Sequence, residues 1–217
     1  MASGAAPLPS GTVTFLLTDV KDSVALWERH PEGMRAALAR HDALIEQLVT
    51  DHFGVVVRPR GEGDSRFAVF TSAWDGVAAA CAVQRALLRE PWPMPEPAQV
   101  RMAVHTGDSD LRDGDYYGSA VNRCARLRGL AHGGQVVLSE MTVKLLGARY
   151  PFDGTVRELG TFVLRGLAAP ERVFQLVHPD LPRDFPATAR DARAAAWSSS
   201  GAGLDDHWPR SRAGGPE

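Results

Sequence analysis

Several features are scarce in this sequence of 217 residues, and each scarcity excludes a class of protein. Cysteine occurs only twice, at Cys81 and Cys124, without CxxC or Cys/His spacing, which argues against a disulfide framework and a zinc site. We expect two buried or half-buried thiols in a reducing compartment. No apolar run approaches the roughly 20 residues that cross a bilayer, and the start MASGAAPLPS is not a signal peptide. We therefore expect a cytoplasmic protein that does not bind membranes.

An excess of charge of either sign is also missing. The chain has 24 Lys and Arg against 26 Asp and Glu, a formal net charge of −2. It has no general electrostatic reason to bind nucleic acid, so any phosphate binding must be local. Hydrophobic residues make up 44% and charged residues 23%, as in average soluble globular proteins. This length and composition predict one domain of good size and a tail.

The composition divides the chain into a lead-in, a domain and a tail. Residues 1–10 are small and rich in proline, and we expect them to be flexible. Beyond His178 the chain is rich in Pro, Ala, Arg, Ser and Gly with few aliphatic residues, so we expect residues 179–217 to be disordered. The domain is therefore predicted to span residues 11–178.

Within the domain, apolar and β-branched runs predict strands, and apolar residues at helical spacing predict helices. Strands are expected at 12–20, 55–58, 65–70, 100–107 and 135–139, with a closing antiparallel pair in 158–167 and 172–177. Helices are expected from 31 to the stop at Gly54, and at 73–89, 118–129 and 140–146. Gly and Asp in residues 108–118 predict an irregular loop. This order predicts an α+β fold of the ferredoxin-like, split βαβ type, with extra C-terminal strands.

Two aspartates fall at the ends of strands that this plan places side by side. Asp19 lies at the end of the first strand, and Asp64 lies in the hairpin turn GEGD. Two like charges held close need a cation, and carboxylate and phosphate oxygens suit Mg²⁺ or Mn²⁺. Two such ions about 4 Å apart would activate an attacking hydroxyl and stabilise the leaving oxygens of a phosphoryl transfer. The alternative is that both are ordinary turn residues.

Asn122 and Arg126 form a second pair of interest, on the expected helix 118–129. They lie four residues apart and therefore share one helical face. An amide beside a guanidinium suits hydrogen bonds to a ribose oxygen and to a phosphorus centre whose charge changes during reaction. A solvated helix face is the alternative interpretation.

Seven segments, taken together, resemble the catalytic domain of the class III nucleotide cyclases, in particular a bacterial, actinobacterial-like subgroup. They are TFLLTD, GEGDSRFAVF, VRMAVHTG, GDYYGSAVNRCARL, HGGQVVLS, ELGTFVLRGL and PERVFQLVHP, in this order between about Thr12 and His178. The resemblance implies a head-to-tail homodimer with two active sites at its interface. One chain would supply the metal ligands, and the other would supply groups that bind the base and the transition state.

The resemblance also implies which residues bind metal. Asp19 and Asp64 match the family's two metal aspartates, and the backbone carbonyl of Val20 would be an added ligand. Two Mg²⁺ or Mn²⁺ ions per site are implied. The implied reaction is attack of the ribose 3′-hydroxyl on the α-phosphate of a nucleoside triphosphate, which gives a 3′,5′-cyclic nucleotide and pyrophosphate. Because the attack is intramolecular, positioning and electrostatics provide most of the catalysis.

Four further residues receive roles in substrate binding and catalysis from the resemblance. Asp115 occupies the position that reads the purine amino group, and Asn122 matches the amide that orients the ribose. Arg126 matches the arginine that stabilises the α-phosphate in the transition state. Arg165, in VLRG, falls where the family commonly has a basic residue for the terminal phosphate.

The sequence departs from the family pattern in two places. Arg60 stands four residues before the second metal aspartate, where adenylate-forming members usually carry lysine, and the two cations are not interchangeable. The stretch after the first metal aspartate usually reads acidic-Gly-Ser-Thr, whereas here it reads Lys21, Asp22, Ser23 and Val24. An added carboxylate near a triphosphate is expected to weaken catalysis, and the lysine to offset part of that repulsion.

These observations favour an adenylate cyclase and leave three alternatives. Arg60 also suits a carbonyl-bearing base, so the substrate of such a cyclase would be GTP or a pyrimidine triphosphate. A module that binds nucleotide and dimerises without catalysis is a second alternative. A different two-metal phosphotransferase on a ferredoxin-like fold is the third, but it would need a Gly-Gly-acidic turn that GEGD does not supply.

Overall fold

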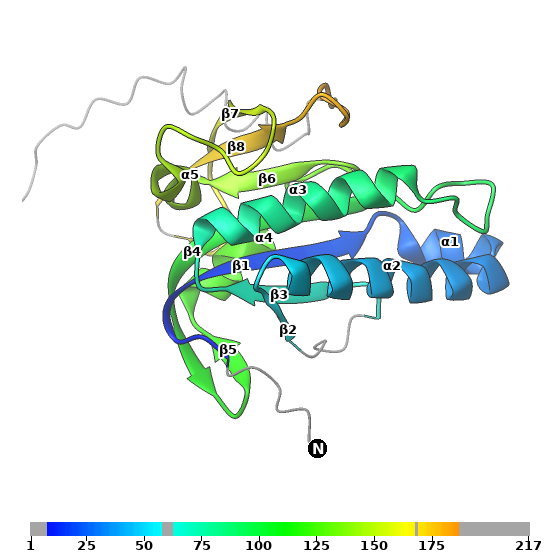
Figure 1. Ribbon diagram of the computed structural model, residues 1–217, viewed down its shortest axis with the longest axis horizontal. Helices are drawn as coiled ribbons and strands as arrows, with labels where there is room; N and C mark the ends of the chain where they lie inside the picture. The colour runs from blue at the N-terminus through cyan, green and yellow to red at the C-terminus, as the bar shows by residue number, and fades with distance from the viewer. Residues whose placement is uncertain (1–7, 58–62, 168, 187–217) are drawn as a thin grey trace, which may run out of the picture.

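A computed structural model describes residues 8–57, 63–167 and 169–186 of the chain. Its strands are β1 (Gly11–Val20), β2 (Val55–Val57), β3 (Arg66–Phe70), β4 (Val100–Arg112), β5 (Asp115–Tyr117), β6 (Val136–Ser139), β7 (Thr155–Phe162) and β8 (Glu171–Val177). They form one sheet in the order β2-β3-β1-β4-β6-β8-β7, and β5 pairs with β4 alone (Figure 1). The order β2-β3-β1-β4 is that of the split βαβ plan, so the expected ferredoxin-like fold is confirmed. The expected C-terminal strands extend it beyond β4.

Helices cover both faces of the sheet. They are α1 (Ser23–Arg29), α2 (Pro31–Asp51), α3 (Ala73–Arg89), α4 (Ser119–Arg128) and α5 (Glu140–Leu146). In Figure 1, α2 and α3 lie in front of the sheet and α4 lies behind it. Alternate residues of β1 enter two separate cores: Leu16 packs in the core that includes Val77 of α3, and Phe15 packs in the core that includes Cys124 of α4. This explains why the β1 sequence is apolar almost throughout.

The prediction of an irregular loop at residues 108–118 is wrong. Strand β4 continues to Arg112, and the chain then turns back through Asp113 (φ 51°) and Gly114 (φ 76°) into β5. Asp and Gly here provide the positive φ angles that a tight hairpin needs. Tyr116 anchors this hairpin, because its ring is fully buried and its hydroxyl donates to the carbonyl of Pro9 at 2.5 Å.

Residues just beyond His178, the predicted end of the domain, contact the helices and the core. Asp180 accepts hydrogen bonds from Arg85 at 2.8 Å and from Arg89 at 2.5 Å, and Leu181 is buried. These contacts join the start of the predicted tail to α3 and to the core. Residues 1–7 and 187–217 lie outside the described residues, so the flexibility expected for them stays a prediction.

Both cysteines are free and buried, as expected. Burial raises the pKa of the Cys81 thiol to about 11 and that of Cys124 to about 12, so both thiols are protonated and unreactive at neutral pH. None of the described helices is both long enough and apolar enough to span a bilayer.

Two buried histidines should make the domain sensitive to acid. Burial lowers the pKa of His41 and of His105 to about 4, and neighbouring arginines contribute in each case. Between pH 6.5 and 4 the unfolded chain binds protons at these positions and the folded chain does not, so stability falls as the pH falls. We expect each histidine to lower the free energy of unfolding by about 2 kcal/mol between pH 7.5 and 5.

Urea denaturation at the two pH values measures this loss. Substituting His105→Gln removes one titrating group and should roughly halve the difference in unfolding free energy. An unchanged difference in that variant would show that other groups cause the acid sensitivity.

Candidate active site

An open cavity of about 550 Å³ lies where β1 ends and the chain turns into α1. It is lined by Asp19, Val20, Asp22, Ser23, Val24, Ala25, Glu28, Asp64, Arg101 and Arg128. The three residues expected to bind metal, Asp19, Val20 and Asp64, therefore lie around one cavity. The antiparallel pairing of β1 with β3 brings them together, because it places the end of β1 beside the turn that precedes β3.

Asp19 is almost buried, with 8% of its surface exposed, and two arginines compensate its charge. Arg101 lies directly opposite it on β4 and donates two hydrogen bonds, from Nε to Oδ1 at 2.8 Å and from Nη2 to Oδ2 at 2.5 Å. The Nε of Arg128 lies 3.7 Å from Oδ2. The Arg101 fork uses one lone pair on each oxygen of Asp19, so a cation that binds Asp19 would either share the carboxylate with Arg101 or displace one arm of the fork.

Asp64 is half-buried in the turn before β3, and this turn is tied to the end of β1. The backbone N–H of Arg66 donates to Oγ1 of Thr18 at 3.2 Å. Nη1 of Arg128 donates to Oγ of Ser65 at 3.0 Å and to the carbonyl oxygen of Thr18 at 3.2 Å. The residues beside Asp64 and Asp19 are thus held by shared contacts.

The chemistry of these donors fits Mg²⁺ or Mn²⁺. Two carboxylates from separate segments face one cavity, and hard oxygen ligands are those that both ions prefer. No group of three His, Cys, Asp or Glu side chains suited to a metal occurs within the described part of the chain. A site here would therefore need water and substrate phosphates to complete the coordination, which is usual for Mg²⁺.

The start of α1 shows why the departure at Asp22 matters. Asp22 has φ 54° and ψ 30°, a left-handed conformation in which glycine is unstrained and which Asp tolerates better than most residues. Its side chain is exposed and lies 3.7 Å from Nζ of Lys21. This backbone conformation accounts for the glycine that the sequence resemblance leads us to expect here, and Asp instead adds a carboxylate to the cavity wall.

Replacing Asp22 should improve binding of the triphosphate that the sequence resemblance implies as substrate. Because the carboxylate repels phosphate, we expect Asp22→Gly and Asp22→Asn each to lower the KM for the triphosphate about threefold at low salt. The free energy of unfolding of Asp22→Gly should differ from that of the unsubstituted protein by less than about 1 kcal/mol, because relief of backbone strain and the greater chain entropy of glycine oppose each other. Steady-state kinetics at two salt concentrations measures the effect, and an unchanged KM in both variants would contradict it.

The other predicted residues lie elsewhere in the chain. Asp115 begins β5, where its Oδ1 accepts from the N–H of Tyr116 at 2.8 Å. Asn122 and Arg126 are exposed on α4, and Arg165 is exposed in the segment between β7 and β8. None of these four lines the cavity that contains the aspartates. One chain therefore does not bring all the predicted residues together.

Comparison with known proteins identifies the family of the chain. Residues 6–177 match the model of the adenylate and guanylate cyclase catalytic domain. The chain belongs to this family, the class III nucleotide cyclases. The expected family is thus confirmed for most of the chain.

Relatives of this cyclase domain include proteins from bacteria and protists. Uncharacterized protein Rv0891c of Mycobacterium tuberculosis (strain ATCC 25618 / H37Rv) is 47% identical over 178 residues, which are 82% of this chain and 60% of that protein. Receptor-type adenylate cyclase GRESAG 4.3 of Trypanosoma brucei brucei is 30% identical over 210 residues, covering 77% of this chain and 17% of the relative. The chain thus spans only part of the length of these relatives.

Solved structures share the fold of this cyclase domain. A Trypanosoma brucei adenylate cyclase, solved in its monomeric state, superimposes with a TM-score of 0.75 at 30% identity, covering 84% of this chain and 96% of the other. The adenylyl cyclase CyaB from P. aeruginosa gives a TM-score of 0.67 at 21% identity, covering 79% and 97%. The second likeness concerns the fold alone.

Two arginines that line the cavity of Asp19 and Asp64 were not predicted from the sequence. Arg101 interrupts the apolar strand β4, and a charged residue in such a strand needs a carboxylate partner, so its position carried a usable signal. Arg128 carried none, because its contacts come from the packing of α4 against β1 and the turn at Ser65. Arg60, expected to contact the base, lies outside the described residues.

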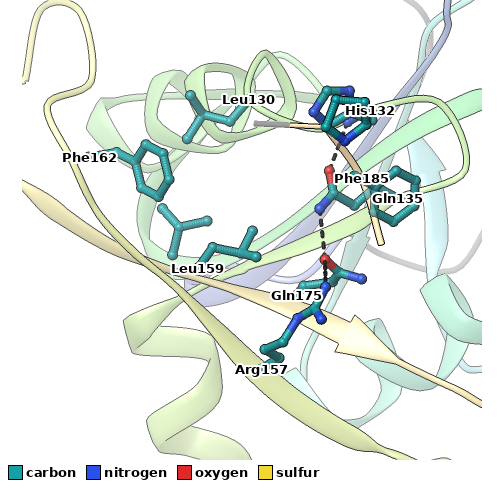
Figure 2. A pocket seen from close by; sticks show the side chains of 10 residues that line it. Leu130, His132, Gln135, Arg157, Leu159, Phe162, Gln175 and Phe185 are labelled. Carbon is teal, nitrogen blue, oxygen red and sulfur yellow. Dashed lines mark hydrogen bonds between the residues drawn. The ribbon is translucent and has the colours of Figure 1, made fainter. Parts of the chain in front are cut away.

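A second cavity of the cyclase domain, of about 280 Å³, lies apart from the aspartates (Figure 2). Figure 2 shows Leu130, Leu159 and Phe162 on one side of it, and the polar side chains together with the ring of Phe185 on the other. Nε2 of Gln135 and Nη2 of Arg157 both donate to Oε1 of Gln175, at 2.9 and 3.2 Å. The side-chain amides of Gln135 and Gln175 are buried and link the start of β6 to β8. Their hydrogen bonds therefore stabilise the fold. None of the predicted site residues lines this cavity.

Proposed function

We propose that this domain converts a nucleoside triphosphate, in the first place ATP, to the 3′,5′-cyclic nucleotide and pyrophosphate. The observation that carries the proposal is the cavity that Asp19 and Asp64 share at the ends of neighbouring strands. Membership of the adenylate and guanylate cyclase family supports this reaction class. The cytoplasm, expected from the sequence, is the proposed location of the reaction.

The carboxylates of Asp19 and Asp64, with the carbonyl of Val20, are proposed to hold two Mg²⁺ or Mn²⁺ ions. Such ions supply Lewis acidity, which activates the attacking hydroxyl and offsets charge on the phosphates. Arg101 has a second role in this proposal. Once released from Asp19, its guanidinium lies at the same cavity and is able to donate two parallel hydrogen bonds to phosphate oxygens. Binding of metal and triphosphate should therefore be mutually supportive.

The remaining groups are proposed to come from a second copy of the chain. Asn122 would orient the ribose, Arg126 would stabilise charge on the α-phosphate, and Arg165 would bind the terminal phosphate. Their exposure supports this, because an exposed face of α4 is available to a partner. A head-to-tail homodimer would then contain two equivalent sites.

Base selection is proposed to depend on Asp115, whose carboxylate is suited to accept a hydrogen bond from the adenine amino group. The partner residue expected from the sequence, Arg60, also suits a carbonyl-bearing base. GTP and the pyrimidine triphosphates therefore remain the alternative substrates of the same reaction.

Incubation of the purified protein with Mn²⁺ and each of the four triphosphates tests the proposal. We expect a 3′,5′-cyclic product, formed fastest from ATP, with release of pyrophosphate. Absence of a cyclic product from all four would contradict it.

A nucleotide-binding module without catalysis is the second candidate. It is favoured by the Arg101 fork that occupies the Asp19 carboxylate and by the additional charge at Asp22. Calorimetry with a triphosphate in the presence of Mn²⁺ distinguishes the two. Binding with no turnover would support the module, and binding with turnover would exclude it.

A further inference from the structure

Arg128 connects the two segments that carry the proposed metal ligands. Its side chain is only 16% exposed. One nitrogen, Nη1, donates to the carbonyl oxygen of Thr18 and to Oγ of Ser65, at 3.2 and 3.0 Å, while Nε lies 3.7 Å from Oδ2 of Asp19. Thr18 precedes Asp19 and Ser65 follows Asp64, so a single guanidinium contacts the chain next to each aspartate.

The same helix carries the residues proposed to act on the ribose and the α-phosphate. Arg126 lies two positions before Arg128, which turns its side chain by roughly 200° around the helix axis. Arg126 and Asn122 are accordingly exposed, whereas Arg128 is turned toward β1 and the Ser65 turn. Helix α4 thus presents proposed catalytic groups on its outer face and holds the carboxylate segments with its inner face.

We propose that Arg128 is a positioning residue that couples these two halves of the catalytic machinery. It holds the Asp19 and Asp64 segments in the arrangement that binds cations, and it fixes α4 relative to them. This inference rests on the proposed cyclase function. In a dimer with shared sites, the aspartates of one chain serve one site and its α4 serves the other, so Arg128 links the two sites of the dimer.

Electrostatics and positioning predict opposite effects on metal binding when Arg128 is replaced. A guanidinium beside Asp19 repels a cation, so removal of its charge alone should strengthen metal binding. Loss of its hydrogen bonds to Thr18 and Ser65 should weaken metal binding, because the two carboxylates are no longer held together. Outer-shell groups that orient metal ligands typically raise metal affinity by roughly 10–100-fold. The direction of the change therefore distinguishes the two roles.

Arg123 provides a matched control on the same helix. It pairs with Glu171 at the start of β8 and lines a different cavity from the aspartates. Arg123→Gln removes an arginine ion pair of α4 without touching the carboxylate segments. Any effect that is due only to a less stable α4 should appear in this variant too.

The first experiment measures metal binding without turnover. The Mn²⁺ concentration that gives half of the maximal rise in Tm is determined with a fixed concentration of a non-cleavable ATP analogue. We expect Arg128→Gln to raise this concentration about tenfold or more. Arg128→Lys keeps the positive charge but loses the planar fork, so its Mn²⁺ requirement should lie between those of the unsubstituted protein and Arg128→Gln. The Mn²⁺ requirement of Arg123→Gln should equal that of the unsubstituted protein. An unchanged or lower Mn²⁺ requirement in Arg128→Gln, in variants that circular dichroism shows to be folded, would overturn the proposal.

The second experiment uses mixed dimers with one intact site. A chain with Asn122→Ala supplies the aspartates, and a chain with Asp64→Ala supplies Asn122 and Arg126 from α4. Placing Arg128→Gln on the first chain should raise the Mn²⁺ requirement for turnover, and placing it on the second should lower kcat with that requirement unchanged. The same effect from either chain would overturn the coupling. If the parent mixture is inactive while the unsubstituted protein turns over, the proposed sharing of sites between chains fails, and if neither turns over, the proposed function fails. The Tm measurement still decides the role of Arg128 in metal binding.

Discussion

Asp64→Ala should abolish formation of the cyclic nucleotide while leaving the domain folded. The proposed ions lose one of their two carboxylates, and a loss of metal-assisted stabilisation of this kind reduces turnover by about a thousandfold or more. The fold should persist because Asp64 is half-buried in a turn at the cavity and does not belong to either hydrophobic core. Product formation by chromatography at high Mn²⁺, together with the Tm, measures both effects.

Two further variants make this result specific. Asp64→Asn keeps the size of the side chain and removes its charge, and it should be nearly as inactive as the alanine variant. Asp51→Ala removes an exposed carboxylate at the end of α2, outside the cavity, and should retain full activity. Activity of Asp64→Ala close to that of the unsubstituted protein would show that this aspartate does not bind the reacting metal.

Mixing two inactive variants should restore activity if the sites are shared between chains. Asp64→Ala and Asn122→Ala damage opposite halves of each site. In a mixed dimer, one site therefore carries both substitutions and the other site carries neither. Random mixing of equal amounts makes half of the dimers mixed, and activity should therefore return to about a quarter of that of the unsubstituted protein.

A mixture of Asp19→Ala with Asp64→Ala provides the control. Both substitutions damage the carboxylate half, so every site of the mixed dimer keeps one damaged aspartate and no activity should return. Absence of rescue in the first mixture, with dimers confirmed by mass, would contradict shared sites. Rescue in the control would show that the two aspartates act from different chains.

The fold was predictable where local pattern and burial agree. The apolar run of β1 indicated a strand buried on both faces, and its place in the middle of the sheet bears this out. The β4–β5 hairpin was not predictable in this way, because Gly and Asp between 108 and 118 suit both an irregular loop and a tight turn. Helix α1 was also missed, because Leu26 is its only buried residue and the segment therefore has no apolar face at helical spacing.

The candidate site was predictable only in part, and for a physical reason. Asp19 and Asp64 could be identified because both stand at strand ends, and the plan of the fold determines which strand ends meet. The contacts of Arg101 and Arg128 depend on the register between β1 and β4 and on the packing of α4, which local sequence does not specify. The conformation of Asp22 likewise became interpretable only once its φ angle was known.

The central claim is that Asp19 and Asp64 together hold divalent ions against a triphosphate. Its most direct test is a crystal structure of the protein grown with Mn²⁺ and a non-cleavable ATP analogue, with anomalous diffraction to locate manganese. The account predicts two manganese peaks between the carboxylates, at about 2.1 Å from their oxygens, and Arg101 turned from Asp19 to the phosphates. An intact Asp19–Arg101 pair, with nucleotide bound and no manganese between the aspartates, would contradict it.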